Sequence, residues 1–369
     1  MRVAFYAPLK PPGHPVPSGD RHIARLFLTA LRHAGHRPFV ASRLRSFDGG
    51  GDAGHQARIA GQGQRIAARL IREWRQRPEA APLLWFTYHL YYKAPDWLGP
   101  GISAALGIPY VVAEASFAAK RSDGPWASGH RAVAAALRQA DAVIGLNSAD
   151  REGVVPLLRE PGHWVALPPF LDAAAYPTRE PRQGGKAPRL IAVAMMRPGD
   201  KLASYRVLGA ALAQLLDLPW SLDIVGDGPA RAAVERALMP LGARVTYRGA
   251  LDDKAVAGAL AQADIFVWPA INEAFGMALL EAQASGLPVV TGASGGVGDI
   301  VVSGRTGMLV PPGDADAFAA AARRLILDPA ARRAMGLAAQ QKVRQEHDLP
   351  TTAARLAALI DSLGRKRAA

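Results

Sequence analysis

Twelve short apolar runs, separated by longer stretches with helical periodicity, limit what this chain can fold into. The runs are residues 3–7, 38–41, 83–87, 110–113, 142–146, 164–167, 189–195, 221–226, 244–249, 264–269, 288–292 and 307–312. Each has the length and composition of a buried strand, and amphipathic helical patterns lie between most of them. Strands that alternate with helices form right-handed βαβ units. The pattern therefore predicts an α/β fold with parallel, doubly wound sheets.

A change in composition near the middle of the chain predicts two domains. Residues 168–188 are rich in Pro, Gly and charged residues and lack apolar periodicity, which is typical of an interdomain linker. We expect an N-terminal domain over 1–167 and a C-terminal domain over 189–348. Residues 349–369 form a final helix, for which a return to the N-terminal domain is one option. Because ligands of such sheets bind beyond the carboxyl ends of the strands, we expect both domains to face a central cleft.

The composition excludes several classes of protein. The chain has no cysteine, so disulfides and thiolate metal sites are ruled out. The apolar run at the N-terminus is too short for a signal peptide, and no run of about 18 apolar residues is present to span a bilayer. A cytoplasmic location is the resulting expectation, with the inner face of a membrane as the alternative.

Positive charge is concentrated near the N-terminus. The net charge is +13, and residues 1–77 hold 14 Lys and Arg residues but only 4 Asp and Glu residues. Such a surface favours an anionic partner, and no recognisable nucleic-acid-binding module is present. The segment 56–77 predicts a basic amphipathic helix that could lie on anionic lipid. The alternative is a helix that packs its stripe of Ile59, Ile66, Leu70 and Trp74 on the sheet and leaves Arg58, Arg65, Arg69 and Arg72 in water.

Two glutamates bracket an otherwise apolar segment in the sequence "EAFGMALLE". Glu273 follows the run at 264–269, and Glu281 lies on a helix that we expect to start near Phe275 and Gly276. The free N–H groups at such a helix start form an anion site. Carboxylate, amides and carboxylate in this order match the sugar hydroxyls, diphosphate and ribose of a nucleotide sugar. In the alternative, Glu273 only caps the helix and Glu281 faces solvent.

Several segments together resemble retaining glycosyltransferases of family 4, which have the GT-B fold. "EAFGMALLE" looks like the E-x7-E motif of that family, and "DIVGDGPARAAVERAL" resembles its strand and Gly-x-Gly-Pro turn. "VTYRGALDDKAVAGALAQADIFVWPA", "ASGLPVVTGASGGVGDIV" and "GRTGMLVPPGDADAFAAA" resemble the stretches around the motif. The resemblance covers residues 189–330 well and the N-terminal half more loosely. It implies that the N-terminal domain binds the acceptor and that the C-terminal domain binds the nucleotide sugar.

The resemblance implies transfer of a hexose from a UDP- or GDP-linked donor to a hydroxyl group, with retention at the anomeric carbon. The acceptor would be a glycan or a lipid-linked glycan, and no metal or other cofactor is expected. Asp314 and Asp316 form a DxD-like pattern, but capping of the following helix is the better interpretation. The implied donor-binding residues are Gly226, Arg248, Phe275, Gly276, Met277, Ala278 and Glu281, with Glu273 on the sugar.

Two cations follow the run at 189–195. By resemblance, Arg197 and Lys201 stabilise the negative charge that develops on the leaving diphosphate. Many family members have one more residue between these two positions, and the alternative is a pair of surface cations.

The N-terminal half supplies the remaining candidates. Gly19 is a candidate for close backbone approach to phosphate, with Asp20 expected to cap the helix after it; a plain turn is the alternative. His89 and Tyr91 leave a strand in an aromatic segment and would lie on the acceptor side. Glu114 stands where relatives have a His, and it would position or deprotonate the acceptor hydroxyl, with His89 as the rival base. The last candidate is Asn147, for which helix capping is the alternative.

Two other functions fit the same pattern. A sugar-nucleotide epimerase of GT-B type would alter the donor without an acceptor, and a non-catalytic protein would only bind a carbohydrate or an anion. The donor's base and sugar, the acceptor, the linkage and the oligomeric state do not follow from the sequence.

Overall fold

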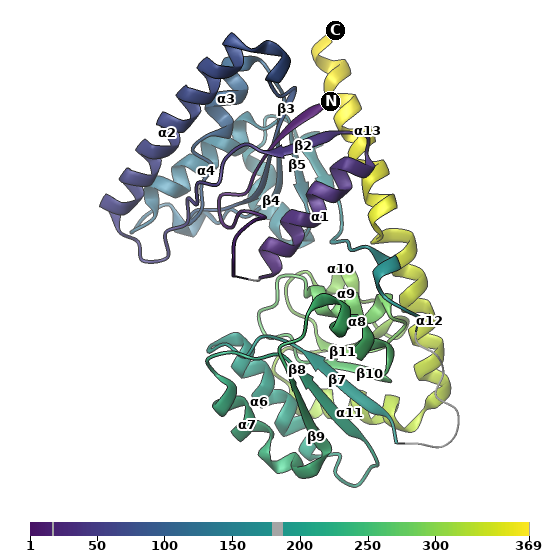
Figure 1. The fold of residues 1–369 in the computed structure, drawn as a ribbon. Coiled ribbons are helices and arrows are strands. Elements are labelled where there is room, and N and C mark those ends of the chain that lie inside the picture. Colours follow the sequence, from purple (N-terminus) through teal and green to yellow (C-terminus); the bar gives the residue numbers. More distant parts are fainter. Residues whose placement is uncertain (17, 179–186, 369) are drawn as a thin grey trace. The chain divides into compact units, whose positions relative to one another are not determined.

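The computed structural model describes residues 1–16, 18–178 and 187–368, and the side chains of all but the last three of these. The chain forms two compact units (Figure 1). The N-terminal unit consists of Met1–Pro168 together with Leu349–Ala369, and the C-terminal unit is Pro169–Asp348. Of the linker expected over 168–188, residues 179–186 lie outside the described residues, and residues 169–178 belong to the C-terminal unit.

The N-terminal unit is built on a six-stranded parallel sheet with the order β2-β1-β3-β4-β5-β6. Its strands are β1 (Arg2–Tyr6), β2 (Arg37–Val40), β3 (Leu84–Leu90), β4 (Tyr110–Ala115), β5 (Ala142–Gly145) and β6 (Trp164–Ala166). Its helices are α1 (Gly19–His33), α2 (Ala53–Gln76), α3 (Gly99–Leu106), α4 (Ala127–Gln139), α5 (Arg151–Val154) and α13 (Leu349–Ala368). Helices α1 and α13 pack side by side, and α3 contacts both α2 and α4 (Figure 1).

The C-terminal unit has a second six-stranded parallel sheet, with the order β12-β11-β10-β7-β8-β9. Its strands are β7 (Arg189–Val193), β8 (Ser221–Val225), β9 (Val245–Gly249), β10 (Ile265–Trp268), β11 (Val289–Gly292) and β12 (Gly307–Val310). Its helices are α6 (Asp200–Ala213), α7 (Arg231–Leu238), α8 (Asp253–Ala261), α9 (Met277–Ala284), α10 (Val297–Ile300), α11 (Ala315–Leu327) and α12 (Pro329–Glu346). All twelve strands predicted from the apolar runs are confirmed.

Side-chain caps fix where several helices begin. The Asp314 carboxylate accepts from the amide of Ala317 at 2.8 Å, so its predicted capping role in α11 is confirmed. The prediction that Asp20 caps α1 is wrong. The cap is Ser18, whose hydroxyl accepts from the amide of Arg21 at 3.3 Å. Asp20 instead lies in the first turn, where its carboxylate contacts a histidine that is distant in the sequence.

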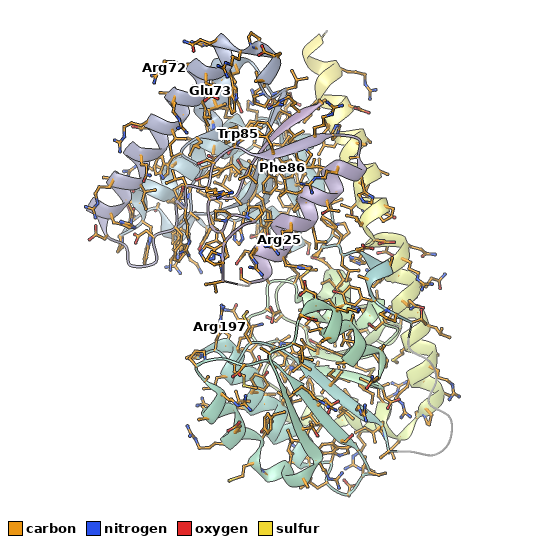
Figure 2. All side chains as sticks on the ribbon, viewed as in Figure 1. Arg25, Arg72, Glu73, Trp85, Phe86 and Arg197 are labelled. Atoms are coloured by element: carbon orange, nitrogen blue, oxygen red, sulfur yellow. The ribbon has the colours of Figure 1, made fainter. Side chains whose placement is uncertain are left out.

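Helix α2 packs its apolar stripe into the core of the N-terminal unit. Ile59, Leu70 and Trp74 are buried, and Ile66 packs against the same core. The arginines on the flank stay exposed, and Arg72 extends from the outer side of the helix (Figure 2). The stripe is therefore unavailable to a bilayer, and only the arginine side could meet one. Among the described residues, no helix combines the length and the hydropathy needed to cross a membrane.

The first and last residues of the C-terminal unit are hydrogen-bonded to each other. The amide of Leu171 donates to the carbonyl of His347 at 3.0 Å, and the imidazole of His347 bonds the carbonyl of Pro169 at 2.7 Å. The amide of Ala173 donates to the carboxylate of Asp348 at 3.0 Å. Beyond Asp348 the chain returns to the N-terminal unit as α13, which buries Leu356 and Ile360 there.

Candidate functional site

The loop between β10 and α9 carries Glu273 in a constrained backbone. Ala270 and Asn272 have φ angles of 54° and 51°, in the left-handed region that non-glycine residues rarely occupy. Ser204 and Ser294 hold the loop, because their hydroxyls accept from the amides of Ile271 at 3.0 Å and Glu273 at 3.1 Å. Strain that surrounding contacts maintain is typical of functional loops.

Lys201 and Glu273 form an ion pair at the carboxyl end of the sheet in the C-terminal unit. The ammonium of Lys201 donates to Oε2 of Glu273 and lies 5.5 Å from the ring centroid of Trp268. The indole N–H of Trp268 also donates to Oε2 of Glu273, at 3.4 Å. The Lys201 and Glu273 side chains are 28% and 18% exposed, so the pair is shielded but open to a ligand. The sequence predicted both residues but not their contact.

Arg197 lies four residues before Lys201 in the chain, and its side chain faces solvent. It is exposed in the loop between β7 and α6 (Figure 2), and its carbonyl accepts from the amide of Leu202 at 3.1 Å. Within the described ranges its guanidinium forms no ion pair, so its charge is available to an anion.

The start of α9 leaves its first amides without a side-chain cap. Gly276 occupies the N-cap position with a φ of 73°, and the helix begins at Met277. A Cβ at Gly276 would lie 2.8 Å from Leu279 Cδ1 and 3.3 Å from Glu273 Cγ, so only glycine fits. Phe275 is buried, whereas Gly276, Met277 and Ala278 are partly exposed. The helix start is therefore not plugged by a capping side chain.

Glu281 lies on α9 and is only partly exposed. Burial and the nearby charge of Asp253 raise the pKa of Glu281 to about 7, while a hydrogen bond with the Tyr176 hydroxyl acts in the opposite direction. Tyr176 comes from the segment that the sequence predicted as a linker, far before Glu281 in the chain. No local pattern in the sequence points to this contact.

Gly226 and Arg248 have structural partners. Gly226 has a φ of 141°, and a Cβ there would lie 1.9 Å from the carbonyl oxygen of Ala194. The Gly-x-Gly turn thus lets the loops after β7 and β8 pack backbone against backbone. Arg248 on β9 donates to the Asp223 carboxylate on β8 at 3.2 Å, which balances much of its charge.

His89, Asp20 and Glu114 meet in the N-terminal unit. Nδ1 of His89 lies 3.0 Å from Oδ1 of Asp20 and 3.8 Å from Oε1 of Glu114. His89 and Glu114 have φ angles of 63° and 58°, so both carry left-handed strain. Burial alone would lower the pKa of His89, but Glu114 and Asp20 raise it to about 9. Burial raises the pKa of Glu114, against the effect of the nearby His89 charge.

The other N-terminal candidates lie around this cluster with less specific contacts. The Tyr91 ring centroid is 5.2 Å from that of His89. Asn147 caps a short 3-10 turn, its side chain accepting from the amide of Ala149 at 2.8 Å, as the capping alternative predicted. Gly19 is the first residue of α1, and nothing lies within 4 Å of where its Cβ would be. Glycine is therefore not required there by space.

Metal ligands do not gather in the part of the chain that the structure describes: no group of three or more His, Asp or Glu residues there could hold an ion.

The C-terminal unit matches a known protein family. Residues 187–328 match the family described as "Glycosyl transferases group 1". The chain carries a group 1 glycosyl transferase domain. Lys201, Glu273, α9 and Glu281 all lie within it, as do Arg197, Gly226 and Arg248.

Curated relatives of the group 1 domain act on sugars. The glycogen synthase of Mycobacterium tuberculosis is 31% identical over 281 residues, which is 70% of this chain and 66% of that protein. A GDP-mannose-dependent alpha-(1-6)-phosphatidylinositol monomannoside mannosyltransferase of Mycolicibacterium smegmatis is 34% identical over 157 residues, 40% of this chain and 41% of that protein. The matches thus span about two thirds or less of these relatives.

Solved structures with similar folds cover nearly the whole chain. Sucrose-phosphate synthase from Thermosynechococcus elongatus has a TM-score of 0.73 at 20% identity, covering 99% of this chain and 100% of that one. Anabaena HepE in complex with UDP has a TM-score of 0.74 at 17% identity, covering 98% and 100%. The predicted fold class, GT-B with two doubly wound Rossmann-like domains, is confirmed.

Proposed function

We propose that this chain is a retaining glycosyltransferase that moves a hexose from a UDP- or GDP-linked donor to a hydroxyl group of a glycan or lipid-linked glycan. The observation that carries the proposal is the pairing of Lys201 with Glu273 beside the uncapped start of α9, inside the group 1 domain. The relatives support the donor class by their names: one is GDP-mannose-dependent, and HepE holds UDP-glucose in one of its complexes.

The donor would lie along α9. Its diphosphate accepts from the amides of Gly276, Met277 and Ala278, where the positive end of the helix dipole favours an anion. Glu281, one end of the motif, accepts from the ribose hydroxyls, and Glu273 accepts from the transferred sugar. Glu273 precedes the helix start in the loop after β10 and Glu281 lies on the helix itself, so the two carboxylates flank these amides along the chain.

The reaction breaks the bond between the anomeric carbon and the diphosphate oxygen, and the bonding electrons leave with the diphosphate. The acceptor oxygen bonds to the anomeric carbon on the same face, and its proton passes to the departing phosphate. Arg197 and Lys201 stabilise the negative charge that develops on the phosphate. This stabilisation is strongest in the transition state. Lys201 is held by Glu273 before the donor arrives, so its ammonium is already oriented.

We expect no metal ion or other cofactor, because these two cations supply the positive charge that a metal would otherwise bring. Activity that is unchanged by EDTA tests this expectation, and activity that depends on added Mg²⁺ or Mn²⁺ would contradict it.

A donor screen tests the function. Purified chain is mixed with UDP-glucose, GDP-mannose and related donors, and its thermal midpoint and sugar transfer are measured. A bound donor raises the midpoint by mass action, and transfer needs both donor and acceptor. Donor conversion without any acceptor would indicate an epimerase, and stabilisation without turnover would indicate a binding protein. The anomeric coupling in the product's proton spectrum tests retention.

The exposed arginines of α2 support a second proposal, a weak association of the protein with a membrane surface. Arg58, Arg65, Arg69 and Arg72 are exposed, and none of them takes part in the ion pairs found among the described residues. We propose that they hold the protein on the cytoplasmic, anionic face of a membrane by charge alone, since the apolar stripe of the helix is buried. Co-sedimentation with anionic liposomes should then disappear at high salt. Binding that survives high salt, or no binding at low salt, contradicts this association.

A further inference from the structure

Carboxylates from three separate elements of the N-terminal unit act on His89. Asp20 comes from the first turn of α1, Glu114 from β4, and Asp150 from the 3-10 turn Ser148–Asp150 after β5. Asp20 is the closest, with 3.0 Å between Oδ1 and Nδ1 of His89. These residues are 69 positions apart in the chain, so the fold, and not local sequence, creates the pair.

The contact with Asp20 fixes which ring nitrogen carries a proton. An ionised carboxylate only accepts hydrogen bonds, so Nδ1 of His89 must be the donor. Nε2 has no hydrogen-bonding partner among the described residues, and the His89 side chain is 20% exposed. The ring can therefore present Nε2 to a ligand while Asp20 holds it in place.

We propose that Asp20 is a positioning residue that keeps His89 as an imidazolium, so that Nε2–H of His89 donates to the acceptor hydroxyl while the Glu114 carboxylate accepts from that hydroxyl. The proposal rests on the proposed glycosyl transfer and deepens it. A hydroxyl both donates and accepts, and a cation beside a carboxylate matches both of its hydrogen-bonding directions. The contact with Glu114 holds the hydroxyl proton while the acceptor is bound, and this proton passes to the departing phosphate only when the bond to the diphosphate breaks.

The charges that face His89 favour this state. Burial lowers the pKa of His89, while the charges of Glu114, Asp20 and Asp150 raise it, with a net value of about 9. Lys10 acts on Asp20 and helps to lower the pKa of that carboxyl. The hydroxyls of Tyr88 and Tyr91 stay protonated, since burial raises the pKa of both. His89 is thus charged at neutral pH, which makes it a hydrogen-bond donor and removes it as the rival base.

Backbone strain at His89 and Glu114 is what we expect if the orientation of these two side chains matters for function. His89 and Glu114 both occupy the left-handed region, and they lie on the paired strands β3 and β4. A relaxed backbone at either position would aim the side chain elsewhere.

The test combines a titration with kinetics on the full chain. Ring ¹⁵N shifts of His89 are followed against pH in the wild type, in Asp20→Asn and in the matched control Asp123→Asn, an exposed carboxylate elsewhere in the same unit. The wild type and the control should titrate near 9, and Asp20→Asn should titrate at least about one pH unit lower, a tenfold change in proton affinity. Titration of wild-type His89 near its ordinary value, or an unchanged value in Asp20→Asn, overturns the proposal.

The acceptor kcat/KM should fall at alkaline pH in the wild type, and this fall should move to lower pH in Asp20→Asn. His89→Gln keeps an N–H donor that does not titrate, so its remaining activity should lack the alkaline fall. A loss in Asp20→Asn that is equal at every pH would mean a structural role and overturn the proposal. The titration needs no turnover: the expected shifts without transfer from any donor would count against the proposed function instead.

Discussion

The ammonium of Lys201 is bonded to the carboxylate of Glu273 at the carboxyl end of the second sheet. One residue follows β7 and the other follows β10, two strands that lie side by side in that sheet. The sequence predicted different roles for them, one toward phosphate and one toward sugar. Because each side chain also holds the other in position, a change in either should disturb both.

Glu273→Gln should lower kcat more than it raises the KM for the donor. The substitution removes the charge that orients Lys201, and a preorganised electrostatic group of this kind contributes about 10²–10³ in kcat. Steady-state kinetics with the best donor measure it. A variant with unchanged kcat would show that the ion pair takes no part in the chemistry.

Arg197→Ala should lower kcat by about 10–100-fold and leave the thermal midpoint within experimental error, because an exposed side chain without an ion pair contributes little to stability. Arg206→Ala is the matched control, since Arg206 is an exposed arginine on the neighbouring helix α6. Equal losses of kcat in both variants would show that Arg197 has no specific role in the reaction.

Donor affinity should weaken as the pH falls through about 7. The pKa of Glu281 is raised to about 7 by burial and by Asp253, so its carboxyl takes up a proton below that pH and then accepts ribose hydrogen bonds poorly. Dissociation constants for UDP or GDP, measured over about three pH units around that value, check this. Glu281→Gln should bind about 10–100-fold more weakly on the alkaline side of the transition, with a flat pH profile.

Tyr176→Phe should move the same transition to higher pH. The Tyr176 hydroxyl bonds the Glu281 carboxylate and lowers its pKa, so removing the hydroxyl lets the pKa of Glu281 rise. The same nucleotide titration measures the midpoint. A midpoint that stays in place or moves to lower pH would show that this hydrogen bond does not lower the pKa of Glu281 in the protein without nucleotide.

Gly226→Ala should destabilise the chain by about 2–4 kcal/mol, the range for a clash combined with a strained backbone. A methyl group there would meet the carbonyl of Ala194, and the φ of 141° disfavours any side chain. Gly19→Ala is the control and should leave the denaturation midpoint unchanged. If Gly19→Ala weakens donor binding without loss of stability, the close approach of phosphate to Gly19 is supported.

The twelve strands could be predicted because buried parallel strands leave continuous apolar runs between turn residues. Glu273 and Glu281 could be found for a similar reason: the strand, the turn and the helix start that place them are contiguous in sequence. Asp20 could not be placed, since Ser18 and Asp20 are both good caps and the contact that decides between them is with His89, far along the chain. Tyr176 and Glu281 likewise meet only through the fold.

The return of α13 sets the order in which the molecule can be completed on the ribosome. All of Pro169–Asp348 leaves the exit tunnel before Leu356 and Ile360 of α13, the helix that covers α1 in the N-terminal unit. The domain made first is therefore finished last, and until then its α1 surface stays bare and prone to wrong contacts. A released chain that ends at Asp348 should hold a protease-resistant C-terminal unit and an N-terminal unit that is still digestible.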